Sequence, residues 1–114
     1  MEKKILFCTW GSGNTYVTFV RVAKESLKTL LVEELENKEL SKDELLKRNL
    51  SLDFSKSTQG YLIPSDQIKM EAGEPKKFRL YKGKDSDSFF TNRNGFCQLY
   101  QLWNNEPVLQ DLGD

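Results

Sequence analysis

The stretch ILFCTWGSGNTYVTFV (residues 5–20) decides the fold, because its Gly-Ser-Gly-Asn joint can connect either two strands or a strand and a helix. The next eight residues, TYVTFVRV (15–22), contain five β-branched and two aromatic side chains, a composition typical of a strand. Glycine supplies the positive φ that a hairpin turn needs. The sequence therefore favours an antiparallel hairpin closed by the loop Gly11–Asn14.

The alternative is a helix that begins after the loop, with exposed first-turn amides that would suit a phosphate. The run Ser12–Thr15 then resembles the phosphate loop of flavodoxin-like proteins, with Ser12 in place of Thr and Trp10 where that family has a hydroxyl residue. The resemblance covers only this loop and its flanks, and the strand–helix alternation of a doubly wound sheet does not follow. It implies a nucleotide or small-phosphate site made of Gly11, Ser12, Gly13, Asn14 and Thr15.

The next part of the chain predicts two helices. In residues 24–37, leucines recur at the helical period, with glutamates beside the apolar stripe. Ser41 followed three residues later by Glu44 forms a capping box, and leucines on either side of the helix start can pack as a staple. We therefore expect a helical hairpin whose second helix ends near Asn49.

Aromatic-rich segments bounded by turn residues predict the strands of an antiparallel sheet. These segments are residues 52–54, 61–63, 78–82, 89–90 and 96–103. A turn is expected at Asn92–Gly95 between the last two, because Asn94-Gly95 is a strong hairpin signal. Ser65 is expected to cap a turn of helix. We expect one α+β domain over residues 1–114: a small, mostly antiparallel β-sheet with a two-helix hairpin packed on one face.

The sequence has no histidine and two cysteines, Cys8 and Cys97. Nucleophiles activated by a histidine base, histidine-ligated metal sites and a four-thiolate zinc site within one chain are thereby excluded. Both cysteines lie among apolar residues and are predicted to be buried and reduced. Carboxylates are the remaining acid–base groups, and those of residues 33–39 are expected on a solvated helix face. We predict no catalytic residues, no metal and no cofactor.

The net charge is zero, but charge alternates in blocks of +3 (1–32), −4 (33–46), +5 (47–84) and −4 (85–114). This pattern predicts a dipolar surface that docks on a charged partner. The longest apolar run, Ile5–Cys8, is too short to span a bilayer, and no secretory signal is visible. The expected location is the cytoplasm of the producing cell or of an infected host, with no membrane contact.

The segment KKFRLYKGK (76–84) has five basic residues in nine. On a strand, Lys77, Arg79 and Tyr81 face one way, and Phe78 and Leu80 the other. The first three are the predicted partner-binding residues, because tyrosine and arginine commonly anchor interfaces. The alternatives are a nucleic-acid contact that combines bases with one stacking ring, and an edge strand that lysines protect from pairing.

These observations favour a small non-enzymatic binding protein that docks on a protein partner. A solitary, histidine-free, Lys/Asn-rich chain suits an accessory or inhibitory protein of a phage or mobile element. Two alternatives stay open: a nucleotide or phosphate binder that uses Gly11–Thr15, and a nucleic-acid-binding module that uses the basic strand 76–84. The partner's identity and the oligomeric state are not predicted.

Overall fold

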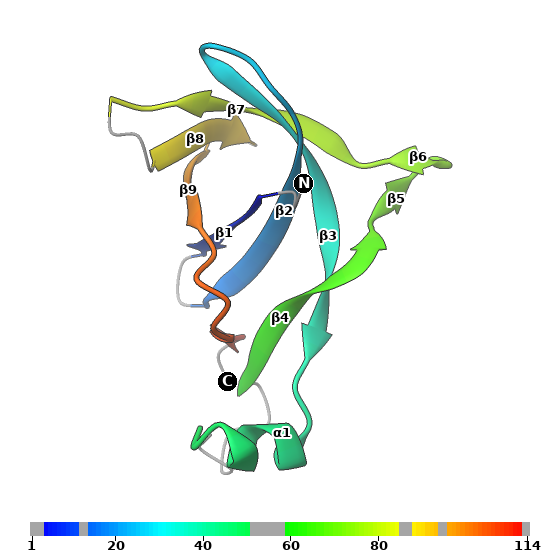
Figure 1. The fold of residues 1–114 in the computed structure, drawn as a ribbon, viewed down its shortest axis with the longest axis vertical. Helices are drawn as coiled ribbons and strands as arrows, with labels where there is room; N and C mark the ends of the chain where they lie inside the picture. Colours follow the sequence, from blue (N-terminus) through cyan, green and yellow to red (C-terminus); the bar gives the residue numbers. More distant parts are fainter. Residues whose placement is uncertain (1–3, 12–13, 51–58, 85–87, 94–95, 113–114) are drawn as a thin grey trace.

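The structure is a computed structural model that describes residues 4–11, 14–50, 59–84, 88–93 and 96–112 (Figure 1). Its elements, in chain order, are β1 (Ile5–Trp10), β2 (Tyr16–Glu25), β3 (Thr29–Glu39), α1 (Lys42–Lys47), β4 (Gln59–Ile68), β5 (Met70–Glu71), β6 (Glu74–Pro75), β7 (Lys77–Lys82), β8 (Ser88–Arg93), β9 (Phe96–Leu102) and β10 (Val108–Asp111). Within the described residues, no helix is long and apolar enough to cross a membrane.

Six strands close into a barrel in the order β1-β2-β3-β7-β8-β9, with β9 returning to β1. Every neighbouring pair is antiparallel. A closed barrel turns one face of each strand inward, where side chains fill the interior. The buried residues of this core are Leu6, Cys8, Val20, Leu30, Val32, Leu80, Phe89 and Tyr100.

β3 has two partners along one of its edges. Residues 29–33 of β3 pair with β7, and residues 35–39 pair with β4, which pairs in turn with β10. β4 and β10 therefore extend from the barrel wall (Figure 1). A second core lies between this extension and the start of β2, and its buried residues are Val17, Phe19, Leu35 and Leu62.

The helix predicted over residues 24–37 is wrong, because this segment is the end of β2 and most of β3. Leu30 packs in the barrel core and Leu35 in the second core. A strand that is buried on both faces lacks the alternation of polar and apolar residues that would reveal it. Glu33 and Glu34, expected on a solvated helix face, are instead buried and ion-paired.

The α+β class is therefore also wrong: the described chain is nearly all β, with one short helix. The predicted two-helix hairpin is absent because its first half is strand. The second predicted helix is α1, and its start is confirmed. Ser41 is the N-cap, and its hydroxyl accepts a hydrogen bond from the Glu44 N–H at 3.3 Å. Leu40 and Leu45 are both buried there.

The hairpin favoured for the first part of the chain is confirmed. β1 and β2 pair antiparallel, from Ile5 opposite Arg21 to Trp10 opposite Tyr16. Gly11 follows the last residue of β1 with φ of 131°, a conformation that L-residues rarely adopt. The joint therefore leads from strand to strand.

Most of the other predicted strands are also confirmed. Residues 61–63 lie in β4, 78–82 in β7, 89–90 in β8, and nearly all of 96–103 in β9. The turn of helix predicted at Ser65 is wrong, since Ser65 lies within β4 and its hydroxyl accepts a hydrogen bond from the Gln67 N–H at 3.1 Å. The turn predicted at Asn92–Gly95 begins too early, since Asn92 and Arg93 still belong to β8 and pair with β9. Residues 52–54 and 94–95 fall outside the described residues.

β5 and β6 form a small hairpin that projects from the sheet (Figure 1). Its turn contains Ala72 and Gly73, at φ of 54° and 82°. The two lysines that flank this hairpin both pair with the Glu34 carboxylate, whose side chain is 5% exposed. Glu34 Oε2 lies 3.0 Å from Lys69 Nζ and 3.7 Å from Lys76 Nζ. The Glu34 backbone bonds to the same two residues. One buried carboxylate therefore fixes where the hairpin leaves the barrel.

Near the start of β2, where β2 no longer pairs with β3, two side chains form hydrogen bonds with the β2 backbone. The Asn37 Nδ2 group donates to the Val17 carbonyl at 3.0 Å, and the Val17 N–H donates to Gln110 Oε1 at 3.2 Å. Val17 is buried, and a buried backbone group without a partner costs free energy. Asn37 and Gln110 therefore stabilise the backbone beside the second core.

Asn37→Ala should lower the free energy of unfolding by about 1–3 kcal/mol, because the buried Val17 carbonyl loses its donor. Denaturant unfolding measures this change. Gln101→Ala removes an exposed amide and serves as the control, with an expected change below about 0.5 kcal/mol. Equal stability of the Asn37 variant and the wild type would contradict the assignment.

Three charged side chains meet at one end of the barrel. Lys82 Nζ lies 2.8 Å from Glu25 Oε2, and Lys4 Nζ lies 3.9 Å from Glu25 Oε1. The Lys82 hydrogen bond and positive charge, with a smaller contribution from Lys4, lower the pKa of Glu25 below its ordinary 4.5. A lowered carboxyl pKa stabilises the folded state above the unfolded-state pKa, and this stabilisation is lost as pH falls through the folded-state pKa.

Lys82→Met should raise the pKa of Glu25 toward 4.5, because it removes both the donor and the main positive charge. An NMR titration of the Glu25 carboxyl carbon measures this pKa. Lys84→Met removes an exposed lysine two residues away and should leave it nearly unchanged. An unshifted Glu25 pKa in the Lys82 variant would refute the pairing.

Candidate functional site

The three predicted partner-binding residues share the outer face of β7. Lys77, Arg79 and Tyr81 are exposed, whereas Leu80 is fully buried and Phe78 packs partly buried against the barrel core. The expected alternation along this strand is confirmed. Their role in binding stays a prediction.

The barrel brings two further apolar residues beside Tyr81. Tyr81 stands opposite Phe90 on β8, and Phe90 stands opposite Leu99 on β9. The Tyr81 and Phe90 ring centroids are 5.9 Å apart at an angle of 33°. Tyr81 is 49% and Leu99 52% exposed. One apolar row therefore crosses three neighbouring strands on the outside of the barrel.

Positive charge lies next to this row. Lys24 of β2 stands opposite Leu31 of β3, which stands opposite Arg79 of β7. One step further along, Arg21, Glu33 and Lys77 form a second row across the same strands. These residues and the apolar row lie on β2, β3, β7, β8 and β9, so the surface they form curves around the barrel with β7 at its middle. We call this outer surface, formed by Lys24, Leu31, Lys77, Arg79, Tyr81, Phe90 and Leu99, the aromatic–basic face.

The one carboxylate in these rows is already paired. Arg21 Nη2 lies 3.0 Å from Glu33 Oε1, and the Glu33 side chain is 11% exposed. Among the described residues, no ion pair involves Lys24, Lys77 or Arg79. Of these three unpaired cations, Arg79 lies two residues from Tyr81, Lys77 lies two residues further along β7, and Lys24 lies two strands away on β2.

Sequence reasoning identified the β7 residues of this face but missed Phe90, Leu99, Leu31 and Lys24. Period-2 alternation could have placed Phe90 and Leu99 on the outside of their own strands. It could not show which side chains of three strands stand opposite one another, because register depends on turn geometry and on the shared core. Lys24 and Leu31 were hidden by the incorrect helix.

The loop of the phosphate alternative lies elsewhere, between β1 and β2. Gly11, Asn14 and Thr15 are described, whereas Ser12 and Gly13 are not. The Asn14 side chain donates to the Tyr16 hydroxyl at 3.2 Å, and Thr15 bridges to Asp111 of β10 through its backbone. The loop leads into a strand, so the helix N-terminus on which the phosphate hypothesis depended is not present.

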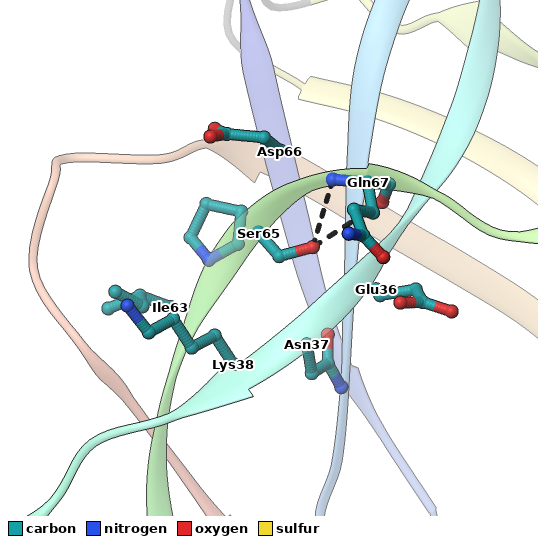
Figure 2. Close-up of a pocket in the computed structure, with 8 residues that line it drawn as sticks. Glu36, Asn37, Lys38, Ile63, Ser65, Asp66 and Gln67 are labelled. Carbon is teal, nitrogen blue, oxygen red and sulfur yellow. Dashed lines mark hydrogen bonds between the residues drawn. The ribbon is translucent and has the colours of Figure 1, made fainter.

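An open groove lies where β4 bulges away from β3 (Figure 2). Three residues of β4 stand opposite the single residue Glu36 of β3. The Asn37 Oδ1 atom is buried there without a hydrogen-bond partner in the described residues. Figure 2 shows the Ser65 hydroxyl directed at Gln67, with Asp66 and Glu36 pointing in different directions. These side chains do not converge on one point, so we attribute the groove to the bulge.

No group of three or more cysteine, aspartate or glutamate side chains in the part of the chain that the structure describes is arranged to hold a metal ion. Cys8 is buried in the barrel core, as predicted. The Cys97 side chain lies outside the description, so its predicted burial stays a prediction.

Comparisons with protein-family models, curated proteins and solved structures found no match to this chain. The residues and geometry of the chain itself must therefore carry the functional argument.

Gly11→Ala should lower the free energy of unfolding by about 1–3 kcal/mol, because φ of 131° strains any L side chain. The added Cβ would also collide with the Asn14 carbonyl oxygen. Thermal unfolding measures the loss. Gly73→Ala is the control: it also has a positive φ, but its Cβ would meet open space, so its loss should be smaller. Equal losses would show that the collision at Gly11 contributes nothing.

Proposed function

We propose that this protein is a non-enzymatic binding protein that docks on another protein through the aromatic–basic face. The main support for this proposal is the row Tyr81–Phe90–Leu99. Tyr81 and Leu99, at its two ends, are each about half exposed. The outward face of an antiparallel sheet is ordinarily polar. A continuous apolar row on such a face supports contact with a partner.

The side chains of the face are those that carry binding energy at interfaces. Tyrosine and arginine are enriched among interface residues whose truncation costs the most affinity. Tyr81 and Arg79 lie two residues apart on one strand and point to the same side. A tyrosine also loses little rotamer freedom on binding, because it has only two side-chain torsions. These properties support Tyr81 and Arg79 as the anchors.

The packing beneath the face supports a preorganised surface. Leu80 and Tyr100 are fully buried directly behind β7 and β9, and Phe89 is buried behind β8. Phe78 and Tyr100 also pack together, with ring centroids 6.0 Å apart. Side chains held on a rigid wall lose less entropy when a partner binds.

Tyr81→Ala should raise the dissociation constant for the partner about 30-fold, equal to about 2 kcal/mol. Its free energy of unfolding should change by no more than about 1 kcal/mol, because the side chain is half exposed. Partners are captured with immobilised wild-type protein from nuclease-treated lysate of the cell in which it occurs. Affinity is then measured by titration with the purified partner.

Leu46→Ala is the matched control, since Leu46 is 74% exposed on α1, away from the face. It should leave the affinity unchanged. Lys84→Ala should mainly slow association and weaken its salt dependence, because a rim charge steers the encounter. A partner that binds the Tyr81 variant as well as the wild type would show that another surface is used.

A further inference from the structure

We infer that the partner presents an acidic protein segment whose carboxylates surround apolar side chains, an inference that rests on the docking function proposed above. The aromatic–basic face has the complementary layout. Arg79 lies two residues from Tyr81, the first member of the apolar row, with Lys77 further along β7 and Lys24 across β3. The carboxylate Glu33 between them is paired with Arg21. Opposite charges across an interface favour the correct partner and speed the encounter.

Among the described residues, cations outside this face such as Lys28, Lys38 and Lys47 also have no ion pair. What distinguishes the face is that Lys77 and Arg79 lie on the same strand as the exposed Tyr81. The chain has a net charge of zero, so these cations are not part of a general excess. Elsewhere on the barrel, Lys4 and Lys82 pair with Glu25, and Lys69 and Lys76 pair with Glu34. The cations of the face lack such intramolecular partners among the described residues, so a binding partner can supply them.

The spacing allows one short segment to make both kinds of contact. Neighbouring strands lie about 5 Å apart, so the row from Tyr81 to Leu99 crosses about 10 Å. Arg79 is two residues from Tyr81, about 7 Å along the strand. This separation is within one Debye length at physiological salt, so carboxylates beside an apolar anchor would be attracted.

The chemistry of the row favours a protein segment over single-stranded nucleic acid. Nucleic-acid faces of this type combine basic residues with aromatic rings on which bases stack. Here two positions of the face are aliphatic: Leu31 lies between Lys24 and Arg79, and Leu99 ends the apolar row. A leucine side chain has no π-face for a base, but it packs well against apolar protein side chains.

The test uses a displayed library of random 12-residue peptides, selected on immobilised wild-type protein and counter-selected on a Tyr81→Ala/Leu99→Ala variant. Selected peptides should be rich in Asp and Glu and should contain large apolar residues. For a selected peptide, Arg79→Ala should raise the dissociation constant about 10–30-fold. Arg48→Ala, an exposed arginine on the distant α1 cap, should change it less than about two-fold.

A charge exchange separates electrostatic recognition from a general loss of structure. In Lys77→Glu/Arg79→Glu, the acidic peptide should lose affinity, and a version with Lys in place of every Asp and Glu should gain it. A variant that had merely unfolded would bind neither peptide, and circular dichroism identifies that case. Lys77→Gln/Arg79→Gln then repeats the test without charge reversal, and it should weaken the acidic peptide alone.

The outcomes distinguish this inference from the docking function itself. Face-dependent peptides that are neutral or basic would overturn the acidic partner and leave protein docking intact. Binding of a thymidine oligonucleotide that Arg79→Ala abolishes, with no face-dependent peptide selected, would overturn both and assign the face to nucleic acid. Failure to select any peptide or to bind the oligonucleotide would also overturn both.

Discussion

The structure depends on β3. Its side chains pack into two cores, and one of its edges pairs with two different strands. Its first half closes the barrel against β7, and its second half carries β4. Leu30 and Val32 fill the barrel core, whereas Leu35 fills the second core. Without β3 the barrel would open, and the β4–β10 extension would have no wall to continue from.

The burial of β3 also puts two adjacent carboxylates out of solvent. Glu33 pairs with Arg21 on the outer surface, and Glu34 pairs with Lys69 and Lys76 beneath the β5–β6 hairpin. A buried carboxylate is tolerated only where cations and hydrogen bonds replace water. In the docking proposed above, the first pair would remove negative charge from a surface whose other charged residues, Lys24, Lys77 and Arg79, are positive.

Much of the local structure could be predicted from the sequence, but the architecture could not. The β-branched run after Gly11, the capping box at Ser41 and the aromatic strands near the C-terminus each have a local physical cause. No local signal identifies β3 as a strand, because its leucines fit a helical period equally well. Only contacts with distant strands decide between strand and helix. The apolar row had to be missed for the same reason. Each member could be placed outside its own strand, but their alignment comes from barrel closure.

The projecting β5–β6 hairpin is a suitable site for inserting a label. All residues from Met70 to Pro75 are exposed, and the base of the hairpin is held by Glu34 and its backbone hydrogen bonds. Exposed turns with few outside contacts are the places where a chain tolerates added residues. A fluorescent tag or epitope inserted between Ala72 and Gly73 would leave both cores and the barrel strands intact. This turn is therefore where a label can be added to the protein.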